Sequence, residues 1–131
     1  MRENTARLFH NGYNRRDGIR LIIFFLERGH MVATKESIFR SKLIKRIKSE
    51  FDNCDVLYND PKRKQGVPDL IILCNDKWAM LETKKDRTSS KRPNQPHYID
   101  KYNAMSFATF VSPDNEEEVL NGLQQTFGTR R

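Results

Sequence analysis

The stretch GVPDLIILCNDKWAMLETK, residues 66–84, holds two apolar segments, 70–74 and 78–81, joined by a short polar turn. Apolar runs of this length bounded by turn residues predict β-strands, and the short connection predicts an antiparallel hairpin. In such a hairpin the start of one strand lies beside the end of the other. Asp69 and Glu82 are therefore expected to converge, and Lys84 shares the face of Glu82 because strand side chains alternate.

Two carboxylates and one ammonium group at a single point suit a divalent metal ion and a water molecule that it activates. Hard cations such as Mg²⁺ or Mn²⁺ take oxygen ligands, and they lower the pKa of a bound water. We therefore expect Asp69, Glu82 and the backbone carbonyl of Thr83 to bind the metal. Lys84 would orient the water or stabilise developing charge. The alternative is that Asp69 is a turn residue and that Glu82 and Lys84 belong to a solvated strand face.

The composition indicates an anionic partner. The chain has 131 residues, a formal net charge of +7 and an isoelectric point near 9.6, and 31% of its residues are charged. A length of this order corresponds to one domain with a modest core. Excess lysine and arginine on a small protein favours a polyanion, with nucleic acid ahead of a membrane surface. The alternative is an ordinary domain that happens to be basic.

The cysteines and histidines show no metal-binding pattern. Cys54 and Cys74 have no neighbouring cysteine or histidine at the spacing of a zinc site. We expect both to be buried thiols in a reducing, cytoplasmic compartment rather than a disulfide or zinc ligands. His10, His30 and His97 are scattered along the chain and form no cluster.

The first 33 residues differ from the rest and are expected to form an accessory extension. Residues 19–26 are apolar except for Arg20. This run is too short to span a bilayer, which takes about 20 apolar residues, and it lacks the cleavage site of a secretory signal. A core or homodimer-interface helix is preferred over a membrane-surface helix, and no membrane partner is expected.

Residues 34–131 are expected to form a compact α/β domain. Apolar residues recur at helical spacing in 34–51, which predicts an amphipathic helix. The expected elements are helix 34–51, strands 54–58, 70–74 and 78–81, helix 94–107, strand 108–111 and helix 113–127.

Three motifs in this domain resemble those of a known superfamily. They are Gly66-Val67-Pro68-Asp69, Glu82-Thr83-Lys84, and the helix entry Pro93-Asn94-Gln95-Pro96-His97-Tyr98. Together they resemble the PD-(D/E)xK nucleases, and within these the VRR-NUC-type phage nucleases described as Holliday-junction-resolvase-like. The resemblance covers residues 34–123. It implies a restriction-endonuclease-like core of order α-β-β-β-α-β, with a mixed central sheet flanked by helices.

The resemblance also suggests two further site residues. In such nucleases an acidic residue near the start of the first helix points at the metal, and Glu36 has that position here. Gln95 resembles the helix glutamine that orients the motif lysine or a phosphate. The alternatives are that Glu36 only offsets the helix dipole and that Gln95 only satisfies the helix start. Asp60 is a weaker candidate for an auxiliary carboxylate and is more simply a loop residue.

Two basic loops flank the expected site. A run of charge is usually a solvated face, but loops that bracket one metal centre favour contact with phosphates. Tyr98 and Tyr102, four residues apart, are assigned to packing rather than to base stacking. The basic residues expected to bind nucleic acid are Lys62, Arg63, Lys64, Lys85, Arg87, Lys91 and Arg92.

The resemblance implies a Mg²⁺- or Mn²⁺-dependent DNA endonuclease, phage-encoded and selective for Holliday junctions, flaps or other branched DNA. Symmetric cleavage of a four-way junction needs two active sites, which implies a homodimer. Two alternatives stay open. One is a sequence-specific nuclease of the homing or restriction type, and the other is a nucleic-acid-binding module that has kept the fold and lost catalysis.

Overall fold

The computed structural model describes residues 33–131, and Lys35–Arg131 form one compact unit. The apolar run at residues 19–26, with the dimer interface expected there, lies outside the described residues, as do His10 and His30. Within the described range, no helix is both long enough and apolar enough to cross a bilayer.

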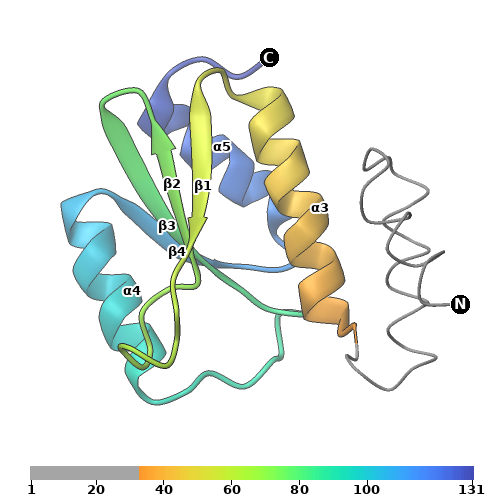
Figure 1. The fold of residues 1–131 in the computed structure, drawn as a ribbon, viewed down its shortest axis with the longest axis vertical. Helices are drawn as coiled ribbons and strands as arrows, with labels where there is room; N and C mark the ends of the chain where they lie inside the picture. Colours follow the sequence, from red (N-terminus) through yellow and green to blue (C-terminus); the bar gives the residue numbers. More distant parts are fainter. Residues whose placement is uncertain (1–32) are drawn as a thin grey trace, which may run out of the picture. The chain divides into compact units, whose positions relative to one another are not determined.

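The elements follow the predicted order (Figure 1). They are α3 (Lys35–Glu50), β1 (Cys54–Tyr58), β2 (Leu70–Cys74), β3 (Lys77–Thr83), α4 (Asn94–Met105), β4 (Phe107–Val111) and α5 (Glu116–Phe127). Two elements differ most from prediction: α5 begins at Glu116 rather than at residue 113, and β3 extends beyond residues 78–81 at both ends. Lys77 pairs with Cys74 in the hairpin, while Glu82 and Thr83 pair with β4. Strand pairing, which local sequence does not reveal, therefore decides its length.

The four strands form one mixed sheet in the order β1-β2-β3-β4. The first three strands are antiparallel neighbours, and β4 runs parallel to β3. A parallel neighbour requires a crossover connection, and α4 supplies it between β3 and β4. The expected α-β-β-β-α-β core with flanking helices is confirmed.

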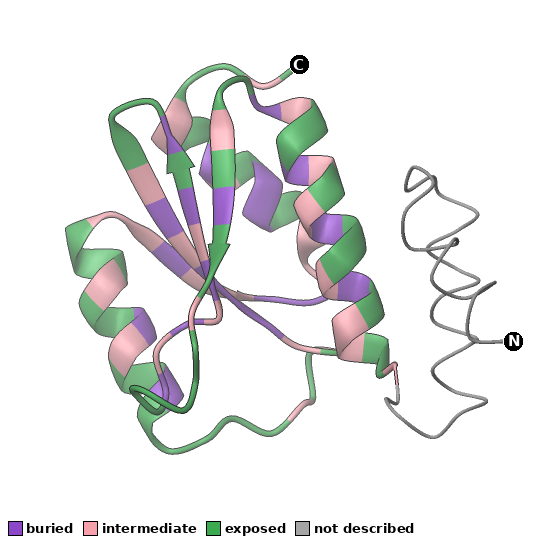
Figure 2. Cartoon of the chain, in the orientation of Figure 1, coloured by how far each residue is buried: buried purple, intermediate pink, exposed green. Residues whose placement is uncertain are grey.

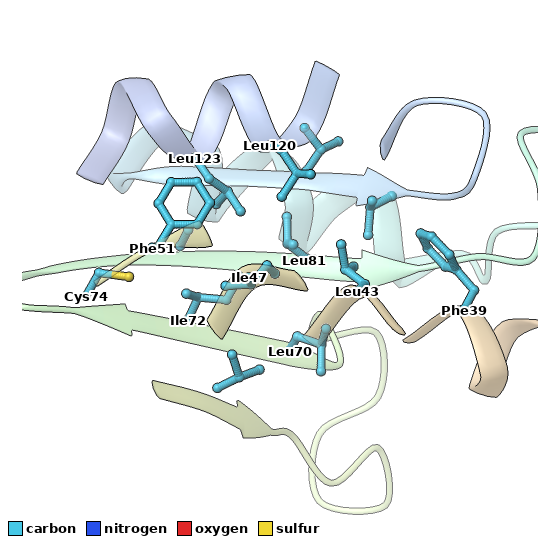
Figure 3. Packing of buried hydrophobic residues seen from close by; sticks show 14 residues of the cluster. Phe39, Leu43, Ile47, Phe51, Leu70, Ile72, Cys74, Leu81, Leu120 and Leu123 are labelled. Atoms are coloured by element: carbon cyan, nitrogen blue, oxygen red, sulfur yellow. The ribbon is translucent and has the colours of Figure 1, made fainter. Parts of the chain in front are cut away.

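The main core lies between the sheet and the pair α3 and α5 (Figure 3). Leu43 and Ile47 of α3, with Leu120 and Leu123 of α5, are completely shielded from solvent. Leu70, Ile72, Cys74, Ala79 and Leu81 meet them from alternate positions of β2 and β3, as a period of two requires. Burial of these side chains is the principal force that fixes α3 against the sheet.

The opposite face of the sheet is only partly covered. Helix α4 packs there mainly against β4, where Ile99 and Ala108 are buried. On β1 and β2 the same side carries Leu57 and Leu73, which are 43% and 41% exposed. Figure 2 shows the exposed and half-buried bands along these strands. The hairpin therefore has one buried face and one face that is partly open.

Cys54 and Cys74 are joined in a disulfide, so the expectation of two separate thiols is wrong. The physical reason is the register of β1 against β2, which places these residues directly opposite each other with Cα atoms 4.2 Å apart. Opposed positions in an antiparallel pair bring Cβ atoms within the range of a disulfide. The bond ties the first strand to the hairpin at the end opposite Asp69.

Candidate active site

The predicted site residues gather at one end of the sheet. Figure 1 shows the start of β2, the end of β3 and the first turns of α3 and α4 at this end. The antiparallel pairing of Leu70 with Leu81 sets this arrangement, because it places the residues just outside that pair side by side. Those residues are Asp69 and Glu82.

Asp69 and Glu82 are linked by backbone hydrogen bonds. The amide of Asp69 donates to Glu82 Oε2 at 3.0 Å, and the amide of Thr83 donates to Asp69 Oδ1 at 3.0 Å. The Thr83 hydroxyl, which is fully buried, donates to Asp69 Oδ2 at 2.5 Å. Each carboxylate is therefore oriented by the strand that carries the other.

Glu82 has an unusual protonation equilibrium. Burial and the nearby charge of Asp69 raise the pKa of Glu82 to about 7, although Lys84 and the Asp69 amide oppose the change. Its side chain is 9% exposed. A buried carboxylate beside a second one keeps its proton more tightly than in water, because the charged form is poorly solvated and repelled. A positive charge placed here would promote ionisation of Glu82.

Lys84 is held by α4 and by the loop that precedes it. Its ammonium group donates to Gln95 Oε1 at 2.9 Å and to the carbonyl of Ser90 at 3.1 Å, and lies 3.9 Å from Glu82 Oε1. The amide nitrogen of Gln95 donates to Glu82 Oε1 at 2.6 Å. Gln95 thus contacts both the carboxylate of Glu82 and the ammonium group of Lys84.

Arg40, which was not assigned to the site from sequence, lies between two of its acids. Its Nε is 2.7 Å from Asp69 Oδ2 and donates to Thr83 Oγ1 at 2.8 Å. Its Nη2 donates to Glu36 Oε1 at 2.8 Å. Glu36 is therefore connected to Asp69 through the guanidinium group. The spacing of four residues between Glu36 and Arg40, a favourable ion-pair spacing on a helix, was the available signal.

The turn before Asp69 depends on a glycine. Gly66 has φ of 90°, and a Cβ atom there would lie 2.6 Å from Asn94 Cβ. The loop on the other side is fixed by Asn59, whose side chain donates to the carbonyl of Pro68. The close approach of Gly66 to the first residue of α4 brings the Pro-Asp turn against the helix that carries Gln95.

The loop after Lys84 forms two hollows beside it. One, of about 360 Å³, is lined by Glu36, Lys84, Lys85, Asp86 and Arg92 with several serine and threonine side chains. The other, of about 250 Å³, is lined in part by Lys84, Arg87 and Lys91. Lys91 also lies over the ring of Phe110 at 4.4 Å. All four basic residues of this loop therefore border hollows that share Lys84.

The first basic loop contacts α4 instead. Lys62 and Arg63 are exposed, and the Lys64 ammonium lies 5.1 Å from the centre of the Tyr98 ring. Asp60 accepts a hydrogen bond from the Lys62 amide within the loop, which gives it a local turn role. Tyr98 stacks on Tyr102 with ring centres 5.9 Å apart.

The donor set fits a hard cation in its chemistry, because Asp69, Glu82 and Glu36 supply carboxylate oxygens. Among residues 33–131, however, no group of three or more histidine, cysteine or acidic side chains is arranged as a metal site. One oxygen of each of two acids, Oδ2 of Asp69 and Oε1 of Glu36, contacts the cationic group of Arg40 instead.

Comparisons with known proteins rest on structure. No protein-family model matches the sequence, and no curated protein matches it. A solved VRR_NUC domain matches with a TM-score of 0.57 at 18% identity, over 68% of this chain and 97% of the other. A second VRR_NUC domain protein matches with a TM-score of 0.51 at 21% identity, over 76% and 93%.

A weaker likeness, with a TM-score of 0.39 at 10% identity, is to Hjc, a Holliday junction resolvase of Archaeoglobus fulgidus, over 58% of this chain and 66% of the other. That likeness is too distant to bear on this chain. The two closer matches share the helix-flanked mixed sheet described above, so the expected resemblance is confirmed in the fold. Residues 33–131 have the restriction-endonuclease-like fold of VRR_NUC domain proteins.

Proposed function

We propose that this protein is a divalent-metal-dependent DNA endonuclease that hydrolyses phosphodiester bonds. The observation that carries the proposal is the convergence of Asp69, Glu82 and Lys84 at one end of the hairpin. A fold shared with VRR_NUC domain proteins supports it. The net charge of +7 suits a polyanionic substrate.

In this proposal Asp69, Glu82, Glu36 and the Thr83 carbonyl hold Mg²⁺ or Mn²⁺, which would supply a bound water of lowered pKa. Glu82 must lose its proton to serve as a ligand. Lys84 carries an ammonium group whose position Gln95 and the Ser90 carbonyl fix. Such a group stabilises negative charge on the phosphate or orients the water, and it cannot act as a base while protonated.

DNA would be bound mainly through its phosphates. Lys85, Arg87, Lys91 and Arg92 border the hollows beside Lys84. Lysine and arginine side chains of this kind contact the phosphates of the DNA backbone, which carry no direct information on base sequence. We therefore propose a structure-selective enzyme for branched, flapped or four-way DNA, which acts as a homodimer so that two sites cut a junction symmetrically.

The direct test is cleavage of labelled duplex, single-stranded, flapped and four-way DNA by the purified protein in Mn²⁺. We expect cleavage of the branched substrates, and none after Asp69→Asn or Lys84→Ala. Both variants should still bind DNA when Ca²⁺ replaces Mn²⁺, which separates loss of chemistry from loss of binding. Unchanged cleavage by Asp69→Asn would rule out the proposed site. Cleavage of unrelated plasmids at fixed sequences would instead indicate a sequence-specific nuclease.

One observation favours a second candidate, a nucleic-acid-binding module without catalysis. Arg40 engages the acids that would bind the metal. A pure binder would bind branched DNA equally well with Mn²⁺ or EDTA and would show no cleavage in either. In that case Lys84→Ala would lower the DNA affinity only by the contribution of one phosphate contact.

A further inference from the structure

Arg40 contacts two of the three acids of the proposed site. Its guanidinium group bridges Glu36 of its own helix and Asp69 at the start of β2. The Nε contact with Asp69, at 2.7 Å, is on Oδ2, the same oxygen that accepts the Thr83 hydroxyl. The Arg40 side chain is 23% exposed, so these contacts are partly shielded from water. Shielding strengthens an ion pair relative to one in bulk solvent.

The positive charge of Arg40 cannot be removed by a change of pH, since arginine stays protonated in proteins. A metal ion can use Asp69 Oδ2 and Glu36 Oε1 only if the guanidinium group moves away from them. No contact joins Arg40 to Glu82, whose oxygens accept from the Asp69 amide and from Gln95 and which has Lys84 Nζ at 3.9 Å. The competition therefore concerns two of the three acids.

We infer that Arg40 is a resident counter-cation of the carboxylate site, which competes with the divalent metal for Asp69 and Glu36. This inference rests on the proposed function, because it concerns the same acids. Arg40 is a positioning residue in this scheme: it keeps Asp69 and Glu36 together without metal and lowers the apparent metal affinity. When the competent state is only a fraction of the population, the apparent dissociation constant rises by the inverse of that fraction.

The test is calorimetric titration of the purified full chain with Mn²⁺ in the absence of DNA. Arg40→Gln removes the charge and retains a polar side chain. We expect it to bind Mn²⁺ about tenfold more tightly, which corresponds to roughly one tenth of the wild-type population being free of the Arg40 contacts. Lys42→Gln, an exposed lysine of the same helix, is the matched control and should bind like wild type. Binding by Arg40→Gln that is equal to or weaker than wild type overturns the inference.

Thermal unfolding gives a second, independent readout. In EDTA, Arg40→Gln should melt at a lower temperature than wild type, because Asp69 and Glu36 lose their counter-charge. Saturating Mn²⁺ should raise its melting temperature more than it raises that of wild type. If Arg40→Gln does not fold, Arg40→Lys decides: a lysine cannot bridge both acids, so a severalfold gain in affinity supports the inference and no gain overturns it.

The outcomes separate the two proposals. Equal Mn²⁺ binding by wild type and Arg40→Gln contradicts the proposed role of Arg40 but is compatible with a metal-dependent nuclease. Absence of Mn²⁺ binding by both removes the metal site and the role of Arg40 together. If Arg40→Gln binds Mn²⁺ and wild type does not, the role of Arg40 as a counter-cation is supported. The wild-type site is then blocked by Arg40, which favours the nucleic-acid-binding module over the nuclease.

Discussion

Gln95 donates a hydrogen bond of 2.6 Å from its side-chain amide to Glu82 Oε1, and this contact joins the start of α4 to the end of β3. The same residue accepts from Lys84 through its side-chain oxygen. It is 7% exposed, so water cannot replace either contact freely. One buried amide therefore holds the acid and the ammonium group of the site in fixed positions.

Replacing Gln95 should damage both stability and activity. Gln95→Leu removes one hydrogen-bond partner from Glu82 Oε1 and one from the Lys84 ammonium group, which costs about 1–3 kcal/mol of unfolding free energy. Cleavage should also slow, because Lys84 loses one of the two acceptors that fix its position. Urea unfolding and single-turnover cleavage measure the two effects. Gln124→Leu, at an exposed position of α5, is the control, and an equal loss in both variants would contradict the role of Gln95.

Glu82 should make the stability of the protein depend on pH. Its folded-state pKa, about 7, lies above its ordinary value of 4.5, so the folded protein holds the proton more tightly than the unfolded chain. The resulting stabilisation is complete below about pH 4.5 and is lost as the pH rises to about 7. We expect a loss of roughly 3 kcal/mol across this range in EDTA.

The comparison that isolates this effect is Glu82→Gln, since a glutamine does not titrate there. The difference in unfolding free energy between wild type and Glu82→Gln should change between pH 5 and pH 7 and stay constant above about pH 8. Parallel stability curves for the two proteins over the whole range would show that Glu82 titrates normally.

Gly66→Ala should destabilise the protein more than Gly128→Ala does. Both glycines have positive φ, 90° and 103°, so both variants place an alanine in an unfavourable backbone conformation. Only at Gly66 would the added Cβ meet a neighbour, 2.6 Å from Asn94 Cβ, whereas no atom lies within 4 Å at Gly128. We expect Gly66→Ala to cost at least about 1 kcal/mol more, measured by chemical unfolding. Equal costs would mean that the turn can move away from α4.

The disulfide should be detectable in the purified protein. Denatured without reductant, the chain should show no free thiol from Cys54 or Cys74 in a colorimetric thiol assay. Reduction should lower the unfolding free energy by about 3 kcal/mol, the entropic estimate for a loop of this length. The unfolding free energy of Cys54→Ser should not change when reductant is added. Two reactive thiols in the unreduced, denatured protein would contradict the bond.

The basic loop after β3 should determine the salt dependence of DNA binding. Each phosphate contact contributes about 0.9 to the slope of log affinity against log salt on duplex DNA. Combined Lys85→Ala and Arg92→Ala should therefore reduce the magnitude of the slope by about 2, as measured by fluorescence anisotropy in Ca²⁺. The pair Lys42→Ala and Lys77→Ala removes the same charge from exposed positions outside this loop. If the control pair changes the slope equally, binding is delocalised over the surface.

Much of the fold was predictable because its signals are local. The helical spacing of Phe39, Leu43 and Ile47 identifies α3, and the turn at residues 75–77 identifies the hairpin. A hairpin brings its two ends together whatever surrounds it, so the convergence of Asp69 and Glu82 followed from sequence. Their role as metal ligands stays a prediction. The ends of β3 were missed, because Lys77 belongs to the strand through its pairing with Cys74 of β2, and Glu82 and Thr83 through their pairing with β4.

Local sequence determined the order of the elements and the pairing of the hairpin, since periodicity and turn residues act over short distances along the chain. The tertiary structure decided which distant side chains meet. The register of β1 against β2 joins Cys54 to Cys74, and the packing of α3 on the sheet places Arg40 between Glu36 and Asp69. The physical reason is that these contacts depend on how separate elements are positioned in space, which the core between α3, α5 and the sheet fixes only once the chain has folded.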